Sequence, residues 1–209
     1  YFCKVRHSYL YKINSKTNLF KKLLFESKKT NHISILLSNR KNNRSNLPKE
    51  YVNYDLIAGI GKIDELISNE NSFEKLKKFH QTNSDWMFGY LSYDLKNEFL
   101  DLDSNNIDGI QANNLSFFVP KYVFLLTGNN LEVLSFQSKK DVDIFVDSLV
   151  VYPDTETSRI QLTSRVNKKE YLDKIAQIQQ DIQKGNIYEL NYCLEYYAND
   201  VNIDSEQLF

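Results

Sequence analysis

Hydrophobic residues recur at intervals of three and four in four parts of the chain, which is the spacing of one face of an α-helix. The clearest of these helices should begin at Asn167, because Asn167 and Glu170 form a capping-box pattern. It should end at Gly185, since glycine accepts the left-handed conformation found at helix C-termini. The other predicted helices cover 19–24, run from an N-cap at Ser72 through Phe79, and cover 141–149.

Short apolar or alternating segments bounded by turn-forming residues predict β-strands. Residues 127–130 read Thr-Gly-Asn-Asn between two such segments, which is a strong signal for a hairpin. The chain is therefore expected to mix strands with helices. The expected strands cover 33–37, 54–60, 86–93, 117–126 and 131–136, with one more inside 1–13.

The residues after Gly185 alternate with a period of two, which predicts a strand over 187–194. Glu189 and Asn191 fall on one face of this strand, and Tyr188 falls on the other with leucine and a further tyrosine. A polar face beside an aromatic wall would suit a sheet that lines a cleft. A solvated outer face gives the same alternation.

Composition and charge indicate a globular protein with no electrostatic attraction to nucleic acid or to an anionic membrane. The 209 residues are 42% hydrophobic and 13% aromatic, and the formal net charge is −1. The basic loop 39–46 carries no aromatic residues that could stack on bases, so it is interpreted as a solvated loop. Gly59-Ile60-Gly61 lacks the other residues of a phosphate loop and is interpreted as a strand end or bulge.

The sequence also bears on where the protein is found. No apolar run is long enough to span a bilayer, and the N-terminus has no signal-peptide pattern. Cys3 and Cys193 fit no metal or redox spacing, so we expect reduced thiols and a cytoplasmic location. The first residue is not methionine and 205–209 read as the start of a helix, so a fragment cut at both ends is expected.

The residues on their own reveal no active site. His7, His32 and His80 lie in ordinary polar or amphipathic settings, so each is interpreted as a surface residue rather than as part of a nucleophilic triad. The carboxylates are scattered, and no two stand at a spacing that implies a shared metal. The pattern therefore indicates a globular α+β domain without a recognisable catalytic set.

Four segments carry a resemblance to a known family. Residues 185–191 read Gly-Asn-Ile-Tyr-Glu-Leu-Asn, and 23–27 read Leu-Leu-Phe-Glu-Ser. Residues 89–98 read Gly-Tyr-Leu-Ser-Tyr-Asp-Leu-Lys-Asn-Glu, and 117–126 read Phe-Phe-Val-Pro-Lys-Tyr-Val-Phe-Leu-Leu. Taken in chain order, the four segments resemble aminodeoxychorismate synthase component I and anthranilate synthase component I. The 89–98 segment is most similar to the aminodeoxychorismate branch.

The resemblance implies an α+β fold of mostly antiparallel sheets in a sandwich flanked by helices. It implies that residues 1–157 form an N-terminal region of the anthranilate synthase component I type. Residues 158–209 would then be the beginning of a chorismate-binding domain.

The resemblance also implies a function. Members of this family add ammonia, supplied by a glutamine amidotransferase subunit, to chorismate with the help of Mg²⁺. The family's metal ligands, acid–base groups and ring-attacking lysine lie downstream of the matched segments, so these 209 residues are predicted to be inactive by themselves. The preferred interpretation is the para-aminobenzoate branch of folate biosynthesis. The alternatives are anthranilate synthase, in tryptophan biosynthesis, and a non-catalytic module that binds an aromatic amino acid or an amidotransferase partner.

A tryptophan pocket is the one binding site that the resemblance implies for this chain. Glu26 and Ser27 match one wall of the pocket, and Tyr188 and Asn191 match the other. A serine hydroxyl can bind an ammonium or carboxylate group, and a tyrosine ring can pack on an indole. The alternative roles are a helix C-terminal or turn residue for Ser27 and a core aromatic for Tyr188.

Overall fold

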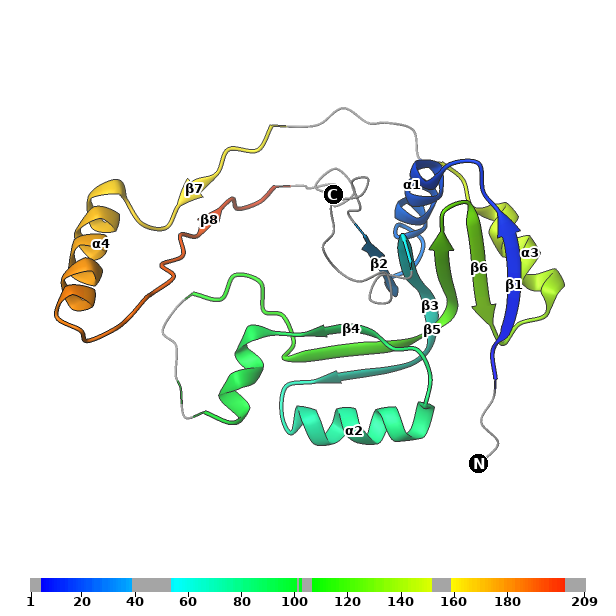
Figure 1. Cartoon of the computed structure of the whole chain (residues 1–209), viewed down its shortest axis with the longest axis horizontal. Helices are drawn as coiled ribbons and strands as arrows, with labels where there is room; N and C mark the ends of the chain where they lie inside the picture. Colours follow the sequence, from blue (N-terminus) through cyan, green and yellow to red (C-terminus); the bar gives the residue numbers. More distant parts are fainter. Residues whose placement is uncertain (1–4, 39–53, 101, 103–106, 152–158, 202–209) are drawn as a thin grey trace. The chain divides into compact units, whose positions relative to one another are not determined.

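The computed structural model describes residues 5–38, 54–100, 102, 107–151 and 159–201 (Figure 1). The chain divides into two compact units, Tyr1–Pro153 and Asp154–Phe209, and each is described by itself. The basic loop 39–46, the helix expected at 205–209 and Cys3 lie outside the described residues.

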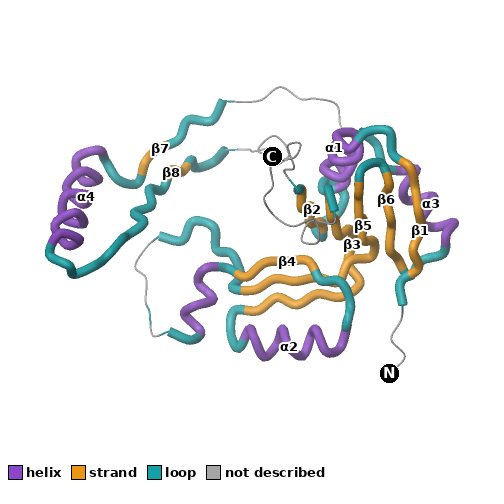
Figure 2. The backbone as a smooth tube through the Cα atoms, viewed as in Figure 1, coloured by secondary structure: helices purple, strands orange, loops and turns teal. Residues whose placement is uncertain are grey.

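The first unit is built on a six-stranded antiparallel sheet in the order β1-β6-β5-β3-β2, with β4 also paired to β5. β3 and β5 are the long strands, and they pair along almost their whole length (Figure 2). The α+β class and the antiparallel pairing are as predicted. The strands are β1 (His7–Lys12), β2 (Ile33–Leu37), β3 (Leu56–Ser68), β4 (Phe88–Leu91), β5 (Leu115–Thr127) and β6 (Asn130–Ser135).

The main core lies between this sheet and two helices, α1 (Lys16–Glu26) and α3 (Lys139–Ser148). Alternate residues of the central strands face the helices, as the period of a strand requires. Tyr122 of β5 stacks on Phe145 of α3 with ring centroids 4.1 Å apart. The predicted helices at 19–24 and 141–149 are therefore confirmed. The buried members of the core are Leu19, Leu23, Leu56, Ala58, Ile60, Tyr122, Phe124, Leu126, Leu131, Val133, Val142 and Leu149.

The predicted hairpin is confirmed between β5 and β6. Thr127 pairs with Asn130, so the turn contains two residues. Gly128 adopts a positive φ of 57°, which glycine accepts at no steric cost. Its N–H donates to a carboxylate oxygen of Asp55 at 2.7 Å, which ties the turn to the residue before β3.

A smaller apolar cluster of Phe88, Phe118, Val123 and Leu125 lies on the other side of the sheet. Gly59 lies under the Phe88 ring, and a Cβ at position 59 would be 2.6 Å from that ring. The lack of a side chain therefore lets the aromatic ring pack on the strand.

The second glycine of this pair marks an irregularity in β3. Gly61 has a φ of 68°, and the pairing of β3 with β5 shifts register between Lys62 and Asp64. Of the two interpretations of Gly59-Ile60-Gly61, a strand end or a bulge, neither holds at these residues, because the register shift follows Gly61. The strand expected at 54–60 does not end there, because it continues after the bulge as far as Ser68.

An almost completely buried ion pair sits next to this bulge. Nε and Nη2 of Arg6 donate to the two carboxylate oxygens of Asp85 at 2.8 and 2.7 Å, and the side chains are 5% and 13% exposed. The same guanidinium donates to the backbone carbonyl of Pro120 at 2.6 Å and, at longer range, to those of Lys121 and Leu134. We call this arrangement the Arg6 clamp. It joins the segment before β1, the segment before β4, and the β5–β6 hairpin.

Helix α2 (Ser72–Asn83) lies beside the second half of β3 (Figure 1). The predicted N-cap was wrong, because Asn71 occupies that position in a left-handed conformation and makes no side-chain cap. Glu98 supplies the cap instead: its carboxylate accepts from the N–H of Ser72 at 2.7 Å and from its hydroxyl at 2.5 Å. Burial raises the pKa of Glu98, but these bonds and one from Asn114 together hold the pKa below its usual value.

The aromatic segment at 86–93 forms a shorter strand than predicted. β4 ends at Leu91, because its partner residue Leu115 is the first of β5, and a 3₁₀ helix (Tyr93–Glu98) follows. Phe88 of this segment is buried in the core, whereas Tyr93 is 82% exposed.

The second unit consists of helix α4 (Lys168–Gln183) and a two-stranded ladder of β7 (Thr163–Ser164) with β8 (Tyr196–Tyr197). The capping box of Asn167 with Glu170 is present, and Gly185 follows the helix with a φ of 74°. Both predicted ends of this helix are therefore confirmed.

The strand predicted over 187–194 was wrong. These residues carry no ladder hydrogen bonds, and pairing begins only at Tyr196. Alternation describes which way side chains point, but a strand also needs a partner, and within the described residues only β7 supplies one. Tyr192 instead stacks on Tyr171 of α4, with ring centroids 5.7 Å apart.

The Arg6 clamp generates a stability prediction. Asp85→Asn should lower the free energy of unfolding by on the order of 3 kcal/mol, because it leaves a buried guanidinium without its counter-charge. Urea unfolding followed by the fluorescence of Trp86 measures the loss. Asp94→Asn is the matched control, since that carboxylate is 62% exposed beside Lys96 and its removal should cost less than about 1 kcal/mol. Equal losses in the two variants would contradict the role given to the clamp.

The Glu98 cap generates a pH prediction. Because its folded-state pKa is lowered, its stabilisation is fully present above the unfolded pKa of about 4.3 and is lost as pH falls through the lower folded value. Glu98→Gln should therefore cost about 1 kcal/mol at pH 7 and progressively less below pH 4. Urea midpoints measured from pH 3 to 7 test this. Glu189→Gln, at an exposed position outside the helices and strands, should show no such pH-dependent difference.

Candidate functional site

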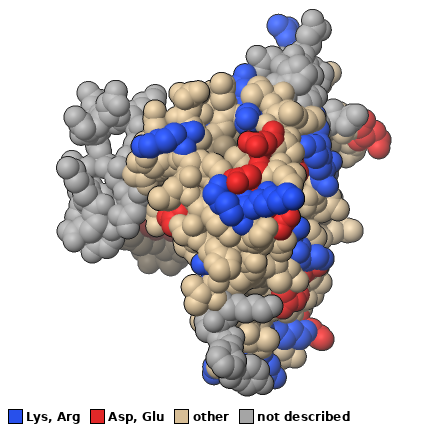
Figure 3. Space-filling view, turned by 90° about the vertical axis from the view of Figure 1, so that its right-hand side faces the viewer, with Lys and Arg blue, Asp and Glu red and all other residues tan. Residues whose placement is uncertain are grey.

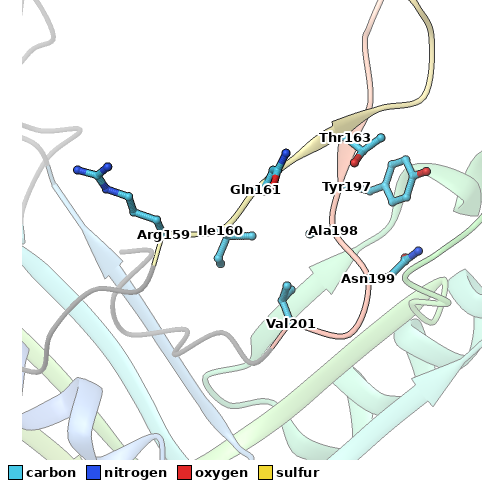
Figure 4. A pocket seen from close by; sticks show the side chains of 8 residues that line it. All are labelled: Arg159, Ile160, Gln161, Thr163, Tyr197, Ala198, Asn199 and Val201. Atoms are coloured by element: carbon cyan, nitrogen blue, oxygen red, sulfur yellow. The ribbon is translucent and has the colours of Figure 1, made fainter.

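The second unit carries a hollow of about 680 Å³ between the residues that precede β7 and those that follow β8 (Figure 4). Arg159, Gln161 and Thr163 line it from the first segment, and Tyr197 and Asn199 from the second. Figure 4 shows the Arg159 and Tyr197 side chains extending in opposite directions. The polar groups therefore do not converge on one point, and the hollow lacks the geometry of a catalytic site.

Three side chains join the two strands next to this hollow. The Arg165 guanidinium lies 3.7 Å from the centroid of the Tyr197 ring, and its Nε donates to Glu195 at 3.0 Å. The hydrogen bond to Glu195 raises the pKa of Arg165, so the guanidinium stays charged. Sequence reasoning missed this cluster, because Arg165 and Glu195 are 30 residues apart and only the register of β7 with β8 brings them together.

Glu26 and Ser27 lie at the C-terminal end of α1. The Glu26 side chain is largely buried, and its carboxylate accepts from Lys29 at 2.8 Å. Ser27 is the C-cap residue, and its hydroxyl donates to the carbonyl of Leu24 at 2.6 Å. The role of Ser27 as a helix C-terminal residue, left open by the sequence, is thus present in the fold.

Tyr188 and Asn191 lie in the segment that follows α4. Tyr188 is 93% exposed, so the alternative role of a core aromatic is excluded for it. Asn191 is exposed as well. Glu26 and Ser27 belong to one compact unit and these two residues to the other, so the tryptophan pocket stays a prediction.

Among the described residues of the first unit, His32 pairs with the carboxylate of Glu65. Nε2 of His32 lies 2.8 Å from one oxygen of Glu65, and Nζ of Lys62 lies 2.5 Å from the other. Hydrogen bonds from Lys62 and His32 lower the pKa of Glu65. No serine or cysteine among the described residues donates to His32, so the pair does not form a nucleophilic triad.

The described residues do not fit the Mg²⁺ site that the family resemblance implies. Nowhere in the described ranges do three or more His, Cys, Asp or Glu side chains gather closely enough to hold a metal ion. Cys193, a free and exposed thiol, is likewise not part of a cluster of metal-binding side chains in the described ranges. No step of a reaction is therefore assigned to a metal held by these residues.

Neither the charge pattern of the face drawn in Figure 3 nor the helices of the described ranges point to a charged partner surface or a membrane span. Figure 3 shows acidic and basic side chains next to one another on the face that it draws, so the described part of that face carries no patch of a single sign. Across the described ranges, no helix is both long enough and apolar enough to cross a bilayer.

The sequence profile described as chorismate binding enzyme matches residues 21–209, which includes most of both compact units. The chain therefore belongs to the family of chorismate-binding enzymes, which are enzymes of chorismate metabolism. A comparison with curated proteins finds no match. The division into 1–157 and 158–209 stays a prediction, because the matched range crosses it.

Proposed function

We propose that the chain is the N-terminal part of an aminodeoxychorismate synthase component I, which aminates chorismate for folate biosynthesis. Membership of the chorismate-binding family supports the substrate. The observation that carries the choice of branch is the segment 89–98, which is most similar to the aminodeoxychorismate branch.

The structural role of this segment supports its use as a marker. At Gly89 a Cβ would lie 2.0 Å from the carbonyl oxygen of Ser116, so a side chain is excluded there. At the other end of the segment Glu98 caps α2 through Ser72. Both residues are tied to the fold of this unit, so the segment carries information about the framework rather than about the chemistry.

We further propose that the groups that carry out the reaction come from outside this chain. A glutamine amidotransferase subunit would supply ammonia, and the ring-attacking lysine and the Mg²⁺ ligands would lie beyond the segments matched here. On this view the 209 residues are a framework that is inactive by itself. A cytoplasmic location is proposed with this role, because chorismate amination and reduced thiols both suit it.

The tryptophan pocket is part of the proposal. The residues that the family resemblance assigns to it are Glu26, Ser27, Tyr188 and Asn191. The exposure of Tyr188 supports a ligand role, because a ring that is 93% accessible gains apolar burial only when something binds to it.

Two alternatives predict different outcomes. The chain would belong to an anthranilate synthase component I if the product is anthranilate. It would be a non-catalytic module that binds an aromatic amino acid or an amidotransferase partner if chorismate is not consumed at all.

The test is a product assay on the protein expressed from its complete gene, supplied with chorismate, ammonium ion and Mg²⁺. We expect 4-amino-4-deoxychorismate, identified by chromatography and mass. Anthranilate, or unchanged chorismate, would overturn the proposal in favour of one of the alternatives.

The tryptophan site is tested by the affinity of the same protein for L-tryptophan, measured by titration. L-Tryptophan should bind, and Tyr188→Ala should weaken its binding by about tenfold, because the packing of the tyrosine ring is lost. Tyr93→Ala, at another exposed ring, should leave that affinity unchanged.

A further inference from the structure

A second cavity lies in the first unit, between the start of α1 and the end of α3. Its volume is about 390 Å³, within the range of about 300–1,000 Å³ of small-molecule pockets. Its floor is apolar and well packed: Leu19, Leu131 and Leu149 are 5%, 1% and 3% exposed, and Val146 lies beside them. The floor therefore belongs to the main core and is fixed in place by it.

Charged and polar side chains surround this floor. Lys22 and Asn18 contribute from one face of α1, one turn apart, and Asp147 contributes from the last turn of α3. Among the residues that the structure describes, none of these three side chains has a hydrogen-bond or ion-pair partner. A cation and an anion without partners thus stand at the rim of one apolar floor.

The other charged groups nearby are already engaged. The Tyr11 hydroxyl donates to Asp143 at 2.7 Å, and Lys139 binds the same carboxylate. Lys12 donates to the side-chain amide of Asn130. Lys22 and Asp147 are therefore the pair that remains available to a ligand at this cavity.

We propose that this cavity binds a free α-amino acid with an apolar side chain. The ligand's carboxylate pairs with Nζ of Lys22, its ammonium group pairs with the carboxylate of Asp147, and its side chain lies on the floor formed by Leu19, Leu131 and Leu149. A molecule with only one of these charges leaves the other rim group unpaired, and a fully polar ligand gains nothing from the floor.

This site is separate from the proposed tryptophan pocket. Lys22 and Asn18 lie in the first half of α1, whereas Glu26 and Ser27 lie at its C-terminal end. Every residue that lines the cavity belongs to the first unit. The proposed ligand of this cavity therefore stands even if L-tryptophan does not bind at the other site or if the full protein does not aminate chorismate.

The test is a methyl NMR titration of the 209-residue chain with three related probes. L-Leucine carries both charges, 3-methylbutylamine lacks the carboxylate, and 4-methylpentanoate lacks the ammonium group. We expect L-leucine to shift the methyl signals of Leu19, Val146 and Leu149 saturably. Each single-charge probe should bind about fivefold more weakly, the effect of one partly exposed ion pair.

Variants test the two rim charges separately. Lys22→Met should weaken L-leucine and the acid but not the amine, and Asp147→Asn should weaken L-leucine and the amine but not the acid. Lys169→Met and Asp173→Asn, on exposed positions of α4, are the matched controls and should change nothing. Absence of methyl shifts with L-leucine, or equal affinity for all three probes, would overturn the proposal, and neither result depends on the variants folding.

Discussion

The first unit depends on the contact between the Arg6 guanidinium and Asp85 at the point where the sheet is irregular. Near the bulge in β3, β5 contains Pro120, which has no N–H to donate to a ladder. Arg6 donates to the carbonyl of Pro120 and, at longer distance, to its neighbour, while Asp85 neutralises the charge. A single side chain therefore satisfies backbone groups in a place where regular pairing is interrupted.

This arrangement explains how one long pair of strands supports two differently built halves. Before the bulge, β3 pairs with β2, and the matching half of β5 pairs with β6, under helices α1 and α3. After the bulge, β5 pairs with β4 and α2 lies beside β3. Within this second half the Glu98 carboxylate fixes the start of α2. Three of the four segments that carry the family resemblance, 23–27, 89–98 and 117–126, belong to the elements of this unit. They therefore mark a framework without forming a catalytic set.

Sequence pattern predicted most of the elements, because helices and hairpins are decided by neighbouring residues. The Asn167 capping box, the glycine after α4 and the 127–130 turn are all local signals, and each is present as expected. The strand over 187–194 failed for a different reason: alternation predicts which way side chains point, but not the existence of a partner strand. The predicted N-cap of α2, Ser72, was wrong because the start of this helix is capped by Glu98, 26 residues further on.

The candidate sites were predicted less well than the fold. Arg6 and Asp85 are 79 residues apart, and Lys22 and Asp147 come from different helices, so no local pattern could join either pair. Only the sheet register and the packing of α1 and α3 bring such side chains together. Family resemblance could place Glu26, Ser27, Tyr188 and Asn191 in sequence, but not in space.

On the proposed function, these residues supply a framework of a chorismate-aminating enzyme and not its chemistry. The most direct measurement is to incubate the purified 209-residue chain alone with chorismate, ammonium ion and Mg²⁺ and to follow the amount of chorismate. On the proposed function, chorismate should disappear no faster than in buffer, because the metal ligands and the ring-attacking lysine are proposed to lie beyond the segments matched here. Enzymatic conversion of chorismate by this chain alone would contradict it.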